Sequence, residues 1–332
     1  MSGEPATGAV REGHEGQEEP EVTARFSRDE LVRGWREREA RQPRVVATTR
    51  LGVKTDLGRV RENNEDKADF YEPEDPTLLA TRGCFYAVAD GMGGHAAGQI
   101  ASEMALKQVI AAYYDSASPT IQTALSEAVV AANEAIHSLA TLVPSRSGMG
   151  TTLTALIVVE DSVYVAQVGD SRAYLIRGGA IRQVTEDHSW VAEQVRLGGM
   201  TTEEAEVSPY RNVITRSIGT QSTVELDLFA EEARSGDRWV LCSDGLTGHV
   251  TDDEILRIAC EQAPSEACRQ LVEVACARGG RDNVTVLVLA IRQMAAPPVD
   301  DAAPSGQPAE ETRAEAEPAG GLRRGRRGLF GR

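Results

Sequence analysis

Acidic residues stand at the edges of apolar, strand-like runs, and their spacing is what first points to chemistry in this sequence. Asp90 ends the run C-F-Y-A-V-A-D-G, Asp244 ends W-V-L-C-S-D-G, and Asp282 directly precedes N-V-T-V-L-V. Three more acids lie beside such runs: Asp170, Glu65 and Asp66. A single D-G or D-N is an ordinary turn signal. Six acids that share one placement instead predict a common site, because strand ends are rigid positions from which to aim side chains.

The chemistry of such a site follows from charge. Carboxylates about 4 Å apart repel by roughly 4 kcal/mol at an effective dielectric of 20, and divalent cations offset that repulsion. Oxygen ligands without histidine or cysteine favour Mg²⁺ or Mn²⁺ over Zn²⁺. Gly91, beside Asp90, lets a backbone carbonyl approach a ligand closely. Arg61, five residues before Asp66, has the planar guanidinium that grips a phosphate, although alone it also fits a surface arginine in a charged turn.

Composition excludes several classes of protein. The 332 residues are 41% apolar, enough for one large or two modest domains, and the formal net charge of −16 argues against a nucleic-acid binder. No apolar run approaches the roughly 20 residues that cross a bilayer, and the N-terminus lacks the apolar core of a signal peptide. The five cysteines form no C-x-x-C pair, as expected of buried thiols in a reducing compartment. We therefore expect a cytoplasmic protein.

Periodicity and composition predict an α+β fold. Runs rich in β-branched and aromatic residues predict strands over 84–89, 152–159, 163–168, 172–177, 238–242 and 283–291. Gly178-Gly179 predicts a hairpin turn, and 185–220 a polar flap. Helical periodicity predicts helices over 96–114, 120–143, 252–263 and 266–279.

Three regions follow one another along the chain. Residues 1–45 read as a disordered acidic segment with a short charged helix, 46–292 as one folded domain, and 293–332 as a disordered tail with a basic C-terminus. The tail ends in GLRRGRRGLFGR, with five arginines and no acid. This end fits a solvated tail, or an electrostatic tether to an acidic partner, an anionic membrane or the acidic N-terminus.

Six motifs occur in the order that they have in a known family: RVRENNED, VADGMGGHAAG, GMGTT, VGDSRAYLIR, LCSDGLT and DNVTV. Over residues 46–292 the sequence resembles the bacterial form of the PPM family, the type 2C metal-dependent serine/threonine protein phosphatases. The resemblance implies a β-sandwich of two antiparallel sheets flanked by helices on both faces. It also implies two Mn²⁺ or Mg²⁺ ions per site, with a third ion in bacterial members.

The resemblance assigns a role to each residue of the site. It implies that Asp90 bridges two metals, that the Gly91 carbonyl binds one of them, and that Asp244 and Asp282 complete the shell of the other. The remaining implied roles are metal or metal-water ligation by Glu65 and Asp66, a third metal at Asp170 with Asp244, and phosphate binding by Arg61. Met92 stands where animal members carry a histidine. His95 is then either a general acid or a buried or capping histidine, and a metal-bound water is the alternative acid.

The function implied is hydrolysis of phosphoserine and phosphothreonine in proteins by a metal-activated water, with Arg61, Asp66 and Asp90 as the catalytic residues. The expected partners are phosphorylated proteins, including a serine/threonine kinase whose work the enzyme reverses, and no nucleic acid. We expect a monomer. Two alternatives stay open: a catalytically weak pseudophosphatase that acts as a signalling binding module, and another two-metal hydrolase such as a nuclease.

Overall fold

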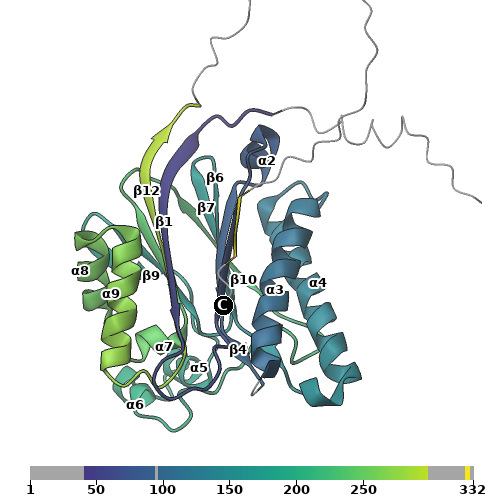
Figure 1. Cartoon of the computed structure of the whole chain (residues 1–332), viewed down its shortest axis with the longest axis vertical. Coiled ribbons are helices and arrows are strands. Elements are labelled where there is room, and N and C mark those ends of the chain that lie inside the picture. Colours follow the sequence, from purple (N-terminus) through teal and green to yellow (C-terminus); the bar gives the residue numbers. More distant parts are fainter. Residues whose placement is uncertain (1–40, 94–95, 298–325, 330–332) are drawn as a thin grey trace, which may run out of the picture. The chain divides into compact units, whose positions relative to one another are not determined.

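Two antiparallel sheets stack face to face, and each carries helices on its outer side (Figure 1). The computed structural model describes residues 41–93, 96–297 and 326–329. The first sheet has the order β1 (Val46–Asp56), β12 (Val284–Ala295), β11 (Arg238–Cys242), β8 (Arg172–Arg177) and β9 (Ala180–Gln183). The second has the order β10 (Asp227–Glu232), β7 (Ser162–Val168), β6 (Leu153–Val159), β3 (Cys84–Ala89), β2 (Lys67–Glu72) and β13 (Arg326–Leu329).

Two pairs of helices form the outer layers. One pair, α3 (Ala96–Asp115) and α4 (Ile121–Leu142), packs on the second sheet, and the other, α8 (Asp252–Glu261) and α9 (Pro264–Ala277), packs on the first. The shorter elements are α2 (Pro76–Thr81), a 3-10 helix η1 (Pro144–Arg146), α5 (Trp190–Arg196), α6 (Thr202–Glu206), α7 (Asp244–Thr247) and the two-residue strands β4 (Gly91–Met92) and β5 (Gly150–Thr151).

Strand β3 shows how the layers are built. Its alternate residues Phe85, Ala87 and Ala89 join the apolar cluster under α3 and α4. Tyr86 and Val88 point the other way, into the cluster between the two sheets. Side chains of a strand alternate between its faces, so a strand buried on both faces reads as an unbroken apolar run. That run is the signal by which the sequence predicted the strand.

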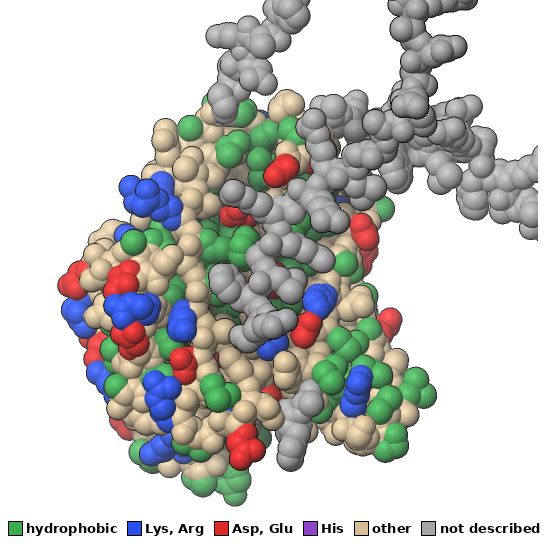
Figure 2. Space-filling model, viewed as in Figure 1, with side chains coloured by type: hydrophobic (Ala, Val, Ile, Leu, Met, Phe, Trp, Pro, Cys, Tyr) green, Lys and Arg blue, Asp and Glu red, His purple; other side chains and the backbone are tan. Residues whose placement is uncertain are grey.

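The outer face of α8 and α9 is polar. Their inner residues, including Ile255, Ile258 and Leu271, are buried against the first sheet. On the outside, Arg269 pairs with Glu266 and Glu273 along α9, and Figure 2 shows the two signs of charge interleaved over this layer. Exposed pairs of this kind add little stability, so packing of the inner face holds these helices in place.

The α+β sandwich flanked by helices is confirmed, as are the predicted central strands and the four long helices. Gly178 and Gly179 have φ of 60° and 81° and join β8 to β9 as predicted. Strands β1, β2 and β10 were not predicted, and the flap at 185–220 contains the helices α5 and α6. No described helix is long and apolar enough to span a bilayer. The short charged helix before residue 41, and His95, lie outside the described residues.

The predicted disordered tail needs one correction. Strand β12 continues to Ala295, and residues 326–329 form β13, which pairs with β2. The basic end of the chain therefore includes an ordered strand, although its composition, rich in arginine and glycine, indicates none.

Candidate functional site

Five of the predicted acids lie where the strands of both sheets end on one side of the sandwich. The pairing explains why: the start of β2 lies opposite the end of β3, and the end of β11 lies opposite the start of β12. Antiparallel neighbours bring one strand's beginning to the other's end. The acids at these ends are Asp66 before β2, Asp90 after β3, Asp170 after β7, Asp244 after β11 and Asp282 before β12.

The electrostatics show that these carboxylates lie within reach of one another's charge. Burial raises the pKa of Asp90 well above its usual range, and the charges of Asp66, Asp244, Asp170 and Asp282 raise it further. Burial is also the main reason why the pKa of Asp66 rises to about 7, against hydrogen bonds that lower it. The pKa of Asp170 rises to about 8 through burial and the charge of Asp244. Each carboxylate is costly to ionise beside the others without a cation.

Three carboxylate oxygens at this site lack a hydrogen-bond partner. Among the described residues, the buried side-chain atoms without a partner are Oδ1 of Asp66, Oδ1 of Asp170, Oδ1 of Asp244 and Nε1 of Trp239 in the core. Buried polar atoms in native proteins are nearly always satisfied. Three orphaned carboxylate oxygens in one place therefore fit ligands of hard divalent cations, which prefer oxygen.

The acids do not form a closed cage. No group of three or more His, Cys, Asp or Glu side chains within the described ranges has the geometry to hold a metal by itself. Two of these carboxylates also have partners within the protein: Ser243 Oγ donates to Asp66 Oδ2 at 2.7 Å, and Arg61 pairs with Asp282. The orphaned oxygens still fit a metal site, because an Mg²⁺-type site takes one or two carboxylates per ion and completes its shell with water.

Arg61 reaches the acids, but through a contact that the sequence did not indicate. Its Nη2 donates to Asp282 Oδ2 at 2.6 Å, while 51% of its side chain stays exposed. The pKa of Arg61 is raised, mainly by this hydrogen bond, and the charges of Glu65 and Asp90 add to the effect. The guanidinium thus stands at the mouth of the acidic site, where it can meet an anionic ligand.

Glu65 and Gly91 lie beside the first turn of α3. A Cβ added to Gly98 would stand 2.4 Å from Glu65 Oε2, so the carboxylate packs directly on that glycine. The Gly91 amide donates to the Glu65 carbonyl at 3.2 Å, and a Cβ on Gly91 would meet the Gly98 carbonyl oxygen at 2.1 Å. Only glycine fits at Gly91 and Gly98, because the strand–turn–helix backbone closes tightly around Glu65.

Two threonines fix the backbone of Asp90, a role that the sequence did not reveal. Thr152 Oγ1 accepts from the Asp90 amide at 2.9 Å, and Thr151 Oγ1 donates to the Asp90 carbonyl at 2.8 Å. Both belong to the GMGTT motif, which the sequence marks only as a sharp turn into a strand. The motif marks these two residues in the sequence, but the sequence does not show that their hydroxyls bind the Asp90 backbone.

Asn283 ties the loop that carries Arg61 and Glu65 to β12. Its Nδ2 donates to the Leu57 carbonyl at 2.9 Å and the Asn63 carbonyl at 3.0 Å, and its Oδ1 accepts from the Glu65 amide at 2.8 Å. A Cβ on Gly245 would lie 1.9 Å from the Asn283 carbonyl oxygen. That close approach brings Asp244, which precedes this glycine, next to the Asp282 side of the site.

A buried histidine supports the Asp170 loop and was missed altogether. His188 Nδ1 accepts from the Gly169 amide at 3.1 Å, so the neutral ring carries its proton on Nε2 and donates to Asp227 at 2.9 Å. The His188 amide donates back to the Gly169 carbonyl at 2.9 Å. Arg216 completes the network with a 2.9 Å bond to Asp227. A lone histidine in a polar segment gave no sequence signal of this role.

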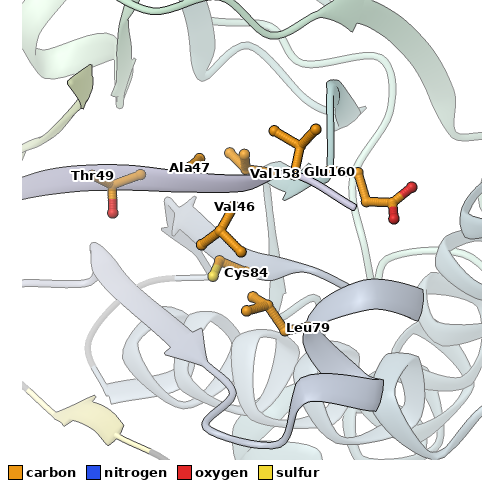
Figure 3. A pocket seen from close by; sticks show the side chains of 8 residues that line it. Val46, Ala47, Thr49, Leu79, Cys84, Val158 and Glu160 are labelled. Carbon is orange, nitrogen blue, oxygen red and sulfur yellow. The ribbon is translucent and has the colours of Figure 1, made fainter. Parts of the chain in front are cut away.

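A small pocket lies at the far end of the sandwich and is not part of this site (Figure 3). It lies where β3 begins, at Cys84, whereas Asp90 follows the end of that strand. Apolar side chains dominate its lining, among them Val46, Leu79 and Val158. Its chemistry suits packing more than a charged ligand.

Comparison with known proteins identifies the family of this chain. The family model described as Protein phosphatase 2C matches residues 54–203. The serine/threonine phosphatase Stp of Listeria innocua is 38% identical over 241 residues, which cover 71% of this chain and 93% of that protein. The chain belongs to the protein phosphatase 2C family. The resemblance on which the sequence analysis relied is therefore confirmed.

Solved structures of the family agree in fold. The Mycobacterium tuberculosis phosphatase PstP has a TM-score of 0.66 at 39% identity, covering 74% of this chain and 99% of that structure. A PstP catalytic domain in complex with 2 manganese ions has a TM-score of 0.65 at 37% identity, covering 75% and 100%. Against the whole PstP sequence, this protein phosphatase 2C chain spans only 45% of the relative's length.

Proposed function

We propose that this chain is a metal-dependent serine/threonine protein phosphatase. The observation that carries the proposal is the group of mutually repelling, buried carboxylates with orphaned oxygens, placed beside an exposed arginine. Membership of protein phosphatase 2C and the two manganese ions in the PstP structure support Mn²⁺ or Mg²⁺ as the ions. The residues that would hold them are Asp66, Asp90, the Gly91 carbonyl, Asp244 and Asp282, with Glu65 close by and Asp170 for a third ion.

The residues of the proposed site each have a physical task in this chemistry. When bound, the ions supply an activated water and positive charge next to the phosphate. Arg61 would leave Asp282 and bind phosphoryl oxygens through two parallel hydrogen bonds. Neutralising those oxygens is most of what a loose phosphoryl-transfer transition state requires. The Thr151 and Thr152 hydroxyls hold Asp90 in place.

The strand cysteines do not fit a covalent route. Burial raises the pKa of Cys242 to about 12 and that of Cys84 to about 12. A thiol is a weak nucleophile unless it is ionised at working pH. Direct attack by water is therefore the reaction that these surroundings favour.

The substrates we propose are phosphoserine and phosphothreonine proteins, including a serine/threonine kinase that the enzyme opposes, and we propose that it acts as a cytoplasmic monomer. A pseudophosphatase would be expected to have lost acids of the site. Here the acids that the family motifs assign to the metals are all present, namely Asp66, Asp90, Asp244 and Asp282, which favours an active enzyme.

The test compares Asp90→Asn and Asp282→Ala with Asp161→Asn, a control at an exposed acid in the β6–β7 turn. Hydrolysis of a phosphothreonine peptide would be measured across a Mn²⁺ titration, with calorimetry of Mn²⁺ binding in parallel. We expect both site variants to lose at least about 100-fold in kcat/KM and the control to keep it. Wild-type protein that binds Mn²⁺ but hydrolyses nothing would favour the pseudophosphatase, and hydrolysis of DNA in place of the peptide would favour a nuclease.

A further inference from the structure

Strand β2 would be the outermost strand of its sheet if β13 did not cover it. The sheet order runs from β10 through β3 to β2 and ends with β13, which is the short yellow strand in Figure 1. The chain itself supplies this last strand from a segment more than 250 residues away in sequence. An open edge presents unpaired amides and carbonyls, and it readily accepts an added extended segment.

The charges of the two partners are complementary. The basic segment, residues 321–332 (GLRRGRRGLFGR), contains five arginines and no acid, within a chain whose net charge is −16. Strand β2 and the turn after it contain one lysine and four acids: Asp69, Glu72, Glu74 and Asp75. Asp69 is buried, and Glu72 accepts a hydrogen bond from the Tyr86 hydroxyl at 2.8 Å, so the exposed acids are Glu74 and Asp75 in the turn. Attraction between a basic segment and an acidic edge steers their encounter and fixes their orientation.

The register points β13 towards the candidate site. The pairing is antiparallel, with Arg326 opposite Glu72 and Leu329 opposite Asp69. Strand β2 starts one residue after Asp66, so β13 runs from the far end of β2 towards the acids. A strand added here therefore lies against the strand that directly follows Asp66.

We propose that the β2 edge is a docking site for an arginine-rich extended segment and that its occupant is the chain's own residues 326–329. Backbone pairing supplies the register, and charge supplies the preference for a basic strand. Tethering within one chain keeps the effective concentration of the segment high. The inference stands independently of the proposed phosphatase activity, because its test measures backbone protection and not hydrolysis.

Proline substitutions in the full-length chain test the pairing without changing a charge. Successive amides of a strand point to opposite sides, so either Gly328 or Leu329 donates towards β2. We would compare Gly328→Pro and Leu329→Pro with Gly320→Pro, a control outside β13, by hydrogen–deuterium exchange of residues 67–72. At least one of the two should speed exchange about fivefold or more, and the control should not. Exchange of residues 67–72 at the wild-type rate in both proline variants would overturn the proposal.

A synthetic peptide separates strand pairing from charge alone. Added to the impaired variant, GLRRGRRGLFGR should restore protection of β2, and raising the salt from about 0.05 M to about 0.5 M should weaken the effect. The same peptide with proline at the impairing position should not restore it. Equal rescue by both peptides would refute strand pairing, and wild-type protection that depends on protein concentration would refute docking within one chain.

Discussion

Replacing Asp66 by asparagine should stabilise the metal-free protein, although it removes a proposed ligand. Asp66 is 1% exposed, and burial raises its pKa from the usual 3.8 to about 7, with Asp244 and Asp282 adding to the rise. Asparagine is nearly the same size and its oxygen still accepts from Ser243 Oγ. The substitution therefore removes a buried charge without opening a cavity.

The size of the expected stabilisation follows from the pKa shift of Asp66. One pKa unit corresponds to about 1.4 kcal/mol, so ionising Asp66 in the folded state costs about 4 kcal/mol at pH 8. Because the folded pKa lies above the unfolded one, the stability contributed by the protonated group is complete below about pH 4 and is lost as the pH rises to about 7. The advantage of Asp66→Asn should thus grow from about 2 kcal/mol at pH 5 to at most about 4 kcal/mol at pH 8.

The assay is urea unfolding of wild type and Asp66→Asn at pH 5 and pH 8, with EDTA or with Mn²⁺. In EDTA the variant should be the more stable protein, and more so at pH 8. An ion held at 100 times its dissociation constant stabilises the wild type by about 2.7 kcal/mol. With Mn²⁺ the order should therefore reverse at pH 5, and the advantage of the variant should shrink to about 1 kcal/mol at pH 8. An advantage in EDTA that does not change with pH, or one that Mn²⁺ does not reduce, would refute this account of the site.

Substitutions at three further positions test how the site is held together and how it binds phosphate. Gly245→Ala should destabilise the fold by about 2 kcal/mol or more, since its Cβ would lie 1.9 Å from the Asn283 carbonyl oxygen, and urea unfolding measures this. Arg61→Lys should raise KM for a phosphopeptide about 10-fold with little change in Mn²⁺ affinity, because lysine cannot form two parallel bonds; an unchanged KM would contradict phosphate binding. His188→Ala should cost about 2 kcal/mol by leaving the Gly169 amide unsatisfied, while His188→Asn should recover part of the loss, and thermal unfolding of both variants distinguishes this from general loss of packing.

The strands missed by sequence reasoning share a place in the fold. Strands β1 and β10 lie at sheet edges, and β2 has only β13 beyond it. Such strands are half exposed: β10 reads D-L-F-A-E-E and has no fully buried position, whereas β6 is buried at all seven positions. Central strands therefore carry an unbroken apolar signal, and outer strands mix in charges that resemble loop composition.

The sequence by itself determined which acids could act and that they occupy strand ends, because apolar periodicity and the turn residues beside Asp90, Asp244 and Asp282 are local properties. It also determined the family, through six motifs in order. Only the tertiary structure decided that Arg61 pairs with Asp282 across 221 positions, that Glu65 packs on α3, and that His188 supports the loop before Asp170. These contacts join segments far apart in the chain, and the pKa values of the acids depend on burial and neighbours that exist only once the sheets have stacked.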